Sequence, residues 1–193
     1  MALPTHRHTR LRGNDYTRGA YFVTLCALDR RQWFGRIIGT GDDARMEPND
    51  LGRIVLEHWH ALPSHFAHLR LDQVQLMPDH LHGILLLSGV GSGVTRVGST
   101  RRVDATTVGV DDPGRDITID VDHSDRPIGP AAGSLGAIIG AFKSGTTYAM
   151  NQLRGTPGQR YWQRGFHDRA IRTTQGEFER IARYIAENPG NWR

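Results

Sequence analysis

Two histidines, His80 and His82, open an apolar run in the stretch QLMPDHLHGILLL, residues 75–87. The Pro78-Asp79 dipeptide is typical of a turn, and the apolar run after it is long enough for one buried strand. Side chains alternate along a strand, so both imidazoles would point to the same face. Two imidazoles side by side on a rigid element are a start toward a divalent-metal site. Half-buried histidines bonded to backbone carbonyls are the alternative, and the spacing alone leaves both open.

A second pair, His58 and His60, has the same spacing but lies in a stretch with helical periodicity. Two residues correspond to roughly 200° around a helix axis, so these side chains diverge. They are therefore not expected to share one ion. His65 and His68 follow in a connection and are interpreted as structural or surface residues.

The composition indicates one domain in a reducing compartment. The chain has 193 residues, of which 38% are hydrophobic and 23% charged, and a domain of this length can bury a sizeable core. Cys26 is the only cysteine, which excludes an internal disulfide. No apolar run approaches the length of a membrane span, and the N-terminal residues lack the apolar segment of a secretory signal. We therefore expect a cytoplasmic protein with no membrane partner.

The basic character of the chain comes from arginine. The net charge is +4 and the pI about 9.7, while Lys143 is the only lysine. A guanidinium presents a planar fork of donors that suits phosphate, so this charge is compatible with nucleic-acid binding. A GC-rich coding sequence would produce the same preference for arginine, so charge alone does not identify the partner.

The hydrophobic pattern predicts strands and helices in alternation. Strands are expected over 20–28, 69–76, 80–87 and 166–171, with 32–38 as a candidate for a short return strand. Helices are expected over 50–62, 134–153 and 174–187. The last of them would begin with a capping box of Thr174 and Glu177 and end at Pro189-Gly190. Residues 39–48 are expected to be loop, and 89–133 a long flexible insertion rich in Gly, Thr, Asp, Arg and Pro.

This order of elements predicts an α+β fold of the ferredoxin-like β-α-β-β-α-β type, an antiparallel sheet with one helix added at the C-terminal end. Strand 20–28 is apolar on both faces and is expected in a central position. The hairpin of 69–76 and 80–87 is expected in the middle of the sheet. The chain 1–193 is then a single domain that contains the insertion 89–133.

Four ordered motifs resemble one family of enzymes. The MPDHLH stretch (77–82) is similar to the histidine-hydrophobic-histidine (HUH) signature of the single-strand DNA transposases that use a tyrosine. The branch called REP-associated tyrosine transposases is resembled further by SLGAII (134–139) with FKS (142–144), WQR (162–164) and YIAENP (184–189), and the early strand YFVT (21–24) fits as well. The likeness spans most of residues 20–192 and is interrupted by the insertion.

The resemblance implies a metal-dependent endonuclease and transposase domain that cleaves and rejoins single-stranded DNA near hairpins through a 5′-phosphotyrosine intermediate. Carried over by position, His80 and His82 would bind a divalent metal, Mg²⁺ or Mn²⁺, and Tyr184 would be the nucleophile. Asn188 would be a third metal ligand, weaker than a carboxylate or glutamine because it offers only a neutral carbonyl oxygen. Tyr184 and Asn188 are four residues apart, so one continuous helix would present both on the same face.

The implied partner is single-stranded DNA with hairpins, in REP-like or element-end sequences at the bacterial nucleoid, bound by a monomer or a homodimer. Contacts to it are expected from Lys143, Trp162, Arg164 and Arg172. Cationic side chains would meet the phosphates and the indole would stack on a base. Core packing of Trp162 and a solvent-facing Lys143 are the open alternatives.

Two other functions fit parts of the pattern. A DNA-binding or regulatory protein could keep the fold without cutting, but it would need neither both histidines nor Tyr184. A replication initiator or conjugative relaxase uses the same histidine pair, usually within a larger protein than a chain of 193 residues. The sequence therefore predicts the transposase-like nuclease.

Overall fold

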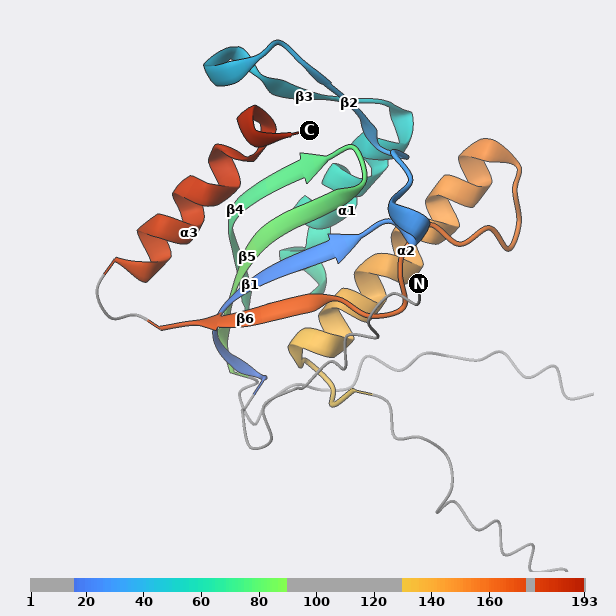
Figure 1. The fold of residues 1–193 in the computed structure, drawn as a ribbon. Coiled ribbons are helices and arrows are strands. Elements are labelled where there is room, and N and C mark those ends of the chain that lie inside the picture. The colour runs from blue at the N-terminus through green and yellow to red at the C-terminus, as the bar shows by residue number, and fades with distance from the viewer. Residues whose placement is uncertain (1–15, 90–129, 173–175, 193) are drawn as a thin grey trace, which may run out of the picture.

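The computed structural model describes residues 16–89, 130–172 and 176–192, so most of the predicted insertion 89–133 lies outside the described residues. Four strands form one antiparallel sheet in the order β4-β5-β1-β6 (Figure 1). Their bounds are β1 (Arg18–Cys26), β4 (Leu69–Met77), β5 (His80–Ser88) and β6 (His167–Ile171). Two helices, α1 (Asp50–His65) and α2 (Leu135–Arg154), pack on one face, and α3 (Glu177–Ala186) packs on the other. The predicted α+β class is confirmed.

The position of β1 in the sheet is as predicted, but that of the β4–β5 hairpin is not. β1 lies between β5 and β6, whereas β4 is an edge strand. The edge position has a physical reason, because β4 carries exposed polar residues at Arg70, Asp72 and Gln73 and shifts its register between Leu71 and Val74. Charged side chains and irregular pairing are common on edge strands, where they prevent pairing with other chains.

A second, two-stranded sheet corrects the prediction for residues 39–48. Strand β2 (Gly35–Ile38) exists as expected, but it pairs with β3 (Arg45–Pro48) through a 3₁₀ turn at Gly41–Asp43. The prediction of loop over 39–48 is therefore wrong for β3. A strand of four residues, RMEP, is too short to show a period of two in the sequence.

The first two helices begin near their predicted starts at residues 50 and 134, and a side chain caps each of them. The Asn49 side chain accepts a hydrogen bond of 3.0 Å from the backbone N–H of Gly52, and the Ser134 hydroxyl accepts one of 3.4 Å from Ala137. Such bonds satisfy backbone donors that the first helical turn leaves free. Helix α2 ends at Gly155, whose φ of +63° lies in the left-handed region that glycine tolerates. In the described part of the chain, no helix combines the length and apolarity that crossing a membrane requires.

Helix α3 begins differently from the prediction. It starts at Glu177 after Gly176, and Thr174 of the expected capping box lies outside the described residues. The Glu177 carboxylate accepts from the backbone N–H of Arg172 at 2.9 Å and from the Arg169 guanidinium at 2.5 Å. These bonds lower the pKa of Glu177. Glu177 therefore ties the start of α3 to the end of β6.

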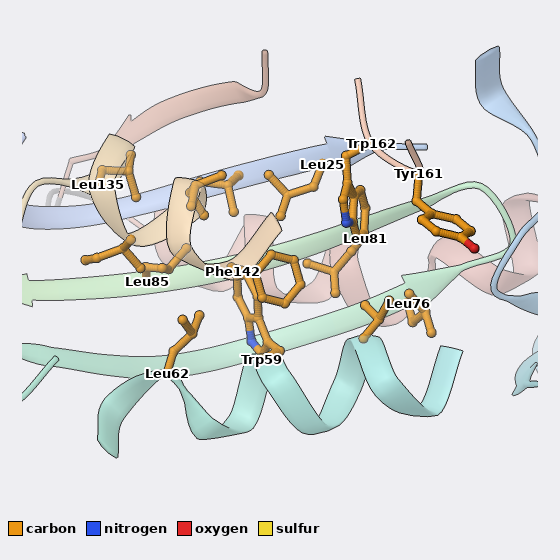
Figure 2. Packing of buried hydrophobic residues seen from close by; sticks show 14 of the residues in the cluster. Leu25, Trp59, Leu62, Leu76, Leu81, Leu85, Leu135, Phe142, Tyr161 and Trp162 are labelled. Carbon is orange, nitrogen blue, oxygen red and sulfur yellow. The ribbon is translucent and has the colours of Figure 1, made fainter. Parts of the chain in front are cut away.

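The main core lies between the sheet and helices α1 and α2 (Figure 2). Trp59 of α1 is fully buried and packs edge-on against Phe142 of α2, with ring centroids 5.5 Å apart. The indole also lies directly on Gly83 of β5, where an added Cβ would stand 2.3 Å from Trp59 Cζ2. Only glycine fits here, so Trp59 fixes the position of β5 one residue after His82.

We expect Gly83→Ala to lower the free energy of unfolding by about 1–3 kcal/mol, because its methyl group overlaps the Trp59 ring and the packed core has to shift. Gly140→Ala is the matched control, since an added Cβ there meets nothing within 4 Å. Gly140 lies inside α2, where alanine should raise the stability by about 0.5–1 kcal/mol. Urea unfolding of both variants measures the two effects, and a Gly83→Ala protein as stable as the parent would contradict the packing argument.

Candidate metal centre and nucleophile

His80 and His82 project from β5 on the face that α3 covers, opposite to the face that packs on Trp59. Their side chains converge, with the two Nε2 atoms 3.0 Å apart. Both residues are buried, with 6% and 5% of their surfaces exposed. Strand alternation thus brings the two imidazoles together as the sequence predicted. Their other partners are side chains, so the alternative of histidines satisfied by backbone carbonyls does not hold.

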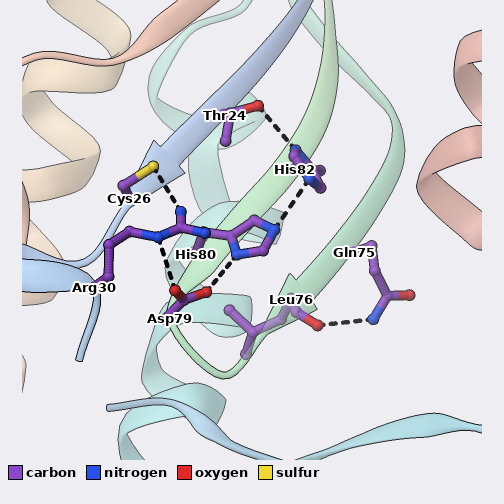
Figure 3. Close-up of polar contacts among 8 residues, drawn as sticks. All are labelled: Thr24, Cys26, Arg30, Gln75, Leu76, Asp79, His80 and His82. Atoms are coloured by element: carbon purple, nitrogen blue, oxygen red, sulfur yellow. Dashed lines mark hydrogen bonds and ion pairs between the residues drawn. The ribbon is translucent and has the colours of Figure 1, made fainter. Parts of the chain in front are cut away.

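Each imidazole is held by an oxygen atom at its second nitrogen. His80 Nδ1 lies 2.5 Å from Asp79 Oδ1, and His82 Nδ1 lies 2.9 Å from the Thr24 hydroxyl (Figure 3). A carboxylate can only accept, so His80 donates to it through Nδ1–H, and Nε2 is the nitrogen that carries the lone pair whenever the ring is neutral. Outer oxygen partners of this kind orient metal-binding histidines and fix their tautomers.

The chemistry of the two facing Nε2 atoms depends on which of them carries a proton. Burial, together with the nearby His80 and Arg30, lowers the pKa of His82 to about 3. The His82 imidazole is therefore neutral at pH 7, the state in which imidazole binds metals. If the Thr24 hydroxyl donates to His82 Nδ1, His82 Nε2–H donates to His80 Nε2; if His82 donates to Thr24 instead, two lone pairs of neutral rings face each other across 3.0 Å. A cation between them removes this repulsion, and nitrogen ligands at about 2.1 Å from one ion lie about 3 Å apart when they are at right angles.

Asp79 is fixed in turn by Arg30. Arg30 Nε lies 2.8 Å from Asp79 Oδ2, and Arg30 Nη1 donates to Cys26 Sγ at 3.1 Å. Asp29 and Arg30 have φ values of 55° and 54°, a left-handed conformation that is uncommon for residues other than glycine. Local strain of this kind persists where the surroundings hold it, often at functional sites. The series Arg30–Asp79–His80 therefore fixes the orientation of one imidazole.

Tyr184 extends from α3 beside the histidine pair. Its ring centroid lies 5.7 Å from that of His82 and 6.2 Å from that of Phe22, which it meets edge-on. The residue is 51% exposed. A tyrosine in this place is open to a large substrate and lies next to the buried imidazoles.

The other tyrosines do not share this position. All five tyrosines of the chain lie in the described ranges. Tyr21 and Tyr161 are buried, and Tyr16 stacks on Tyr21 with centroids 5.7 Å apart. Tyr148 is exposed but belongs to α2, on the opposite face of the sheet. Tyr184 is therefore the tyrosine that combines exposure with proximity to the histidines.

Asn188 does not lie on the same helix as Tyr184, which corrects the prediction of one continuous helical face. Helix α3 ends at Ala186, and Asn188 begins the 3₁₀ turn η3 (Asn188–Asn191). Pro189 explains the break, because proline restricts the residue before it and has no N–H to donate. Asn188 is nevertheless buried, and Trp192 after it lies with its ring centroid 6.1 Å from that of His80. The residue that follows η3, Trp192, therefore lies near one of the two histidines.

A third protein ligand would have to be a neutral oxygen. In the described residues, no group of three or more His, Cys, Asp or Glu side chains could bind one ion. Asn188 is one candidate, and Gln75 is another because it pairs with His82 in the β4–β5 register. Directly opposed side chains in an antiparallel pair point to the same face. Sequence reasoning missed Gln75, Thr24 and Arg30, since strand register and long-range contacts have no local signal.

Three of the four residues predicted to contact DNA line one hollow, and Arg172 lies apart from them at the far end of β6. Trp162 is only 5% exposed, and its Nε1 donates to the Thr146 hydroxyl at 2.9 Å. The alternative of core packing is the one observed for Trp162 (Figure 2). Arg164 is exposed on the same segment.

Lys143 is partly buried and acts as a bridge between α2 and this segment. Its ammonium donates to the carbonyl oxygens of Gln163 at 2.9 Å and Gly165 at 2.6 Å. Burial lowers the pKa of Lys143 to about 8. Two of its three donors are therefore used inside the protein, which leaves one for a ligand.

Comparison with known proteins places the fold. No family model matches this chain. An uncharacterized protein of Haemophilus influenzae Rd is 27% identical over 187 residues, which cover 96% of this chain and 89% of that protein. The structure of a REP-associated tyrosine transposase bound to a REP hairpin is similar with a TM-score of 0.53 at 13% identity, covering 98% of this chain and 74% of that one. A candidate transposase from Deinococcus radiodurans R1 gives a TM-score of 0.44 at 12% identity. The likeness at 0.53 shows that this chain has the transposase-like fold.

We expect Lys143→Met to lower the free energy of unfolding by about 1–3 kcal/mol, because two carbonyl groups lose their donor. Arg164→Met is the control, since it removes an exposed cation from the same segment.

The Lys143 pKa falls from 10.5 to about 8 on folding. The unfolded chain thus binds more protons between these values, and the contribution of Lys143 to stability rises with pH across that window. Urea unfolding from pH 7.5 to 10.5 should show this rise in the parent and not in Lys143→Met, and identical slopes would argue against it.

Proposed function

We propose that this protein is a transposase-like nuclease that cuts single-stranded DNA and joins the 5′ side to Tyr184, using a divalent metal bound by His80 and His82. The observation that carries the proposal is the meeting of three groups on one face of the sheet. Two Nε2 atoms lie 3.0 Å apart, and the ring of the half-exposed Tyr184 lies 5.7 Å from that of His82. The fold shared with a REP-associated tyrosine transposase supports the same class of chemistry.

The residues present fit a divalent cation. His80 and His82 offer neutral nitrogens, and Asp79 and Thr24 hold the rings from behind. Asn188 or Gln75 would add a neutral oxygen, which suits Mg²⁺ or Mn²⁺, and imidazole ligands favour Mn²⁺ of the two. The bound ion would act as a Lewis acid that draws charge from the scissile phosphate.

The protein side of the reaction follows from the position of Tyr184. A phenol has a pKa near 10 and is a weak nucleophile, so it must be held in line with its target. The edge of Phe22 and the ring of His82 fix the ring of Tyr184 beside the metal ligands. Tyr184 Oη attacks phosphorus, a tyrosyl ester bond forms, and the bond from phosphorus to the 3′ oxygen breaks. The phenolic proton passes to water, and the departing oxygen takes up a proton to become a 3′ hydroxyl.

The phosphotyrosine keeps the free energy of the broken bond. A later 3′ hydroxyl can attack it, release Tyr184 and join two strands. Because one phosphate ester bond replaces another, this joining needs no ATP, as transposition requires. Hairpin-bearing DNA of REP-like or element-end sequence is the proposed substrate, since the similar transposase is bound to a REP hairpin. Arg164 and Arg172 are exposed cations available to its phosphates.

We expect Tyr184→Phe to abolish the covalent protein–DNA adduct, because it removes the attacking oxygen and leaves the ring contacts with Phe22 and His82. The assay incubates the full chain with a single-stranded hairpin oligonucleotide and Mn²⁺, followed by denaturing electrophoresis. Tyr148→Phe is the matched control and should form the adduct at the parental level, because Tyr148 lies on the other face of the sheet. An adduct on Tyr184→Phe would place the nucleophile elsewhere.

We expect His82→Ala to weaken Mn²⁺ binding by at least about tenfold, because one of two nitrogen ligands is lost. Asp79→Asn should weaken it by about 10–100-fold through loss of the carboxylate that orients His80. His60→Ala is the control, since His60 is exposed on α1. Titration calorimetry with MnCl₂ measures the affinity without DNA, and equal binding by His82→Ala and the parent would remove the metal from the proposal.

A further inference from the structure

A second feature with nucleic-acid chemistry lies on the helix side of the sheet. A hollow of about 460 Å³ opens between α2 and residues 160–164. Its lining includes three cationic side chains, Lys143, Arg160 and Arg164, and the aromatic ring of Tyr148. No carboxylate is among the lining residues, so the hollow has a positive character throughout.

Tyr148 is the most exposed large hydrophobic residue of the described chain, at 68%. A single exposed aromatic residue on a helix is common and needs no function by itself. Here the ring lies at the wall of a hollow that also carries three cationic side chains and no carboxylate. An aromatic face beside cations is the arrangement by which proteins hold single-stranded nucleic acid, with a base on the ring and phosphates on the cations.

The cations of this hollow are available to a ligand. Arg160 and Arg164 are exposed, and neither forms an ion pair with a described residue. Lys143 holds the backbone of Gln163 and Gly165 through two donors, which fixes the segment that carries Arg164. This backbone segment is therefore in place before any ligand binds, so little conformational entropy is lost on binding.

The hollow is connected to the histidine pair by short backbone contacts. Gln163 of the lining donates its N–H to the carbonyl of Cys26 at 3.0 Å, and Cys26 pairs with His80 in the β1–β5 register. Neighbouring strands are about 5 Å apart, so Gln163 lies roughly two strand spacings, about 10 Å, from His80. A strand of DNA that passes the end of β1 could reach both places within a few nucleotides.

We propose that this hollow binds the single-stranded DNA that flanks the cleavage position, with one base stacked on Tyr148 and phosphates bound by Arg160 and Arg164. The inference rests on the proposed function and names a second binding site for the same substrate. It differs from the catalytic site in its residues and in the face of the sheet it occupies. Its loss should weaken DNA binding and leave the chemical step of bound DNA intact.

The test measures binding apart from cleavage. The full chain with Tyr184→Phe is titrated with a fluorescent single-stranded oligonucleotide in EDTA, and anisotropy reports the affinity. Tyr148→Ala should weaken binding about five- to a hundredfold, and Tyr148→Phe should restore it because the stacking face returns. Arg160→Ala should weaken binding and reduce the slope of log affinity against log salt by about one.

The controls separate this site from general effects. Leu153→Ala removes another exposed apolar side chain from α2, and Arg70→Ala removes an exposed cation from β4; both should bind like the parent. If the parent binds DNA and Tyr148→Ala and Arg160→Ala bind equally well, the hollow is not a DNA site and the proposed function stands. If the parent binds no single-stranded DNA, both proposals fall.

A second experiment measures single-turnover cleavage at saturating DNA. Tyr148→Ala with Tyr184 intact should react at the parental rate, and a slower rate would assign Tyr148 to the chemistry instead.

Discussion

The alternation of side chains along β5 is the constraint on which the site depends. One face of β5 packs toward helices α1 and α2 and carries Leu81, Gly83 and Leu85. The other face points toward α3 and carries His80 and His82. A slip of one residue would exchange imidazoles for leucines and bury polar groups in the main core, so the register has to be unique. The contact between Trp59 and Gly83 enforces it, since no other residue of the strand could accept an indole at that distance. The packing of one face thus determines the chemistry of the other.

Burying two imidazoles has a cost that the fold offsets only in part. Asp79 and Thr24 satisfy one nitrogen of each ring, and the remaining nitrogens face each other. Buried polar groups are normally paired, and the two rings form a hydrogen bond in the tautomer in which the Thr24 hydroxyl donates to His82 Nδ1 and His82 Nε2–H donates to His80. In the other tautomer of His82 two lone pairs face each other, and this is the state that the proposed cation would bind.

The sequence predicted those features that depend on short segments of the chain, such as helices, strands and turns. The helical segments and the histidine-bearing strand all lie near their expected places. The divergence of the second histidine pair is also observed, since His58 Nδ1 lies 2.9 Å from the Ile54 carbonyl and His60 is exposed. The turn at Pro78-Asp79 was visible in the sequence, but the role of Asp79 was not, because it requires Arg30 from another part of the chain. The partner of His82, Thr24, follows from strand register, which the sequence does not encode in any short segment.

The two halves of the site are held with different strength. The histidines stand on a central strand backed by the main core, which includes Trp59 and Phe142. Helix α3, which carries Tyr184, packs through a smaller cluster around Ile84, Ile171 and Ile185, and its start is tied to β6 by Glu177. Elements with few buried apolar contacts open more readily than the core. This division would suit the proposed reaction, in which His80 and His82 would hold the metal in a fixed place while Tyr184, once joined to DNA, would have to let a new 3′ hydroxyl approach.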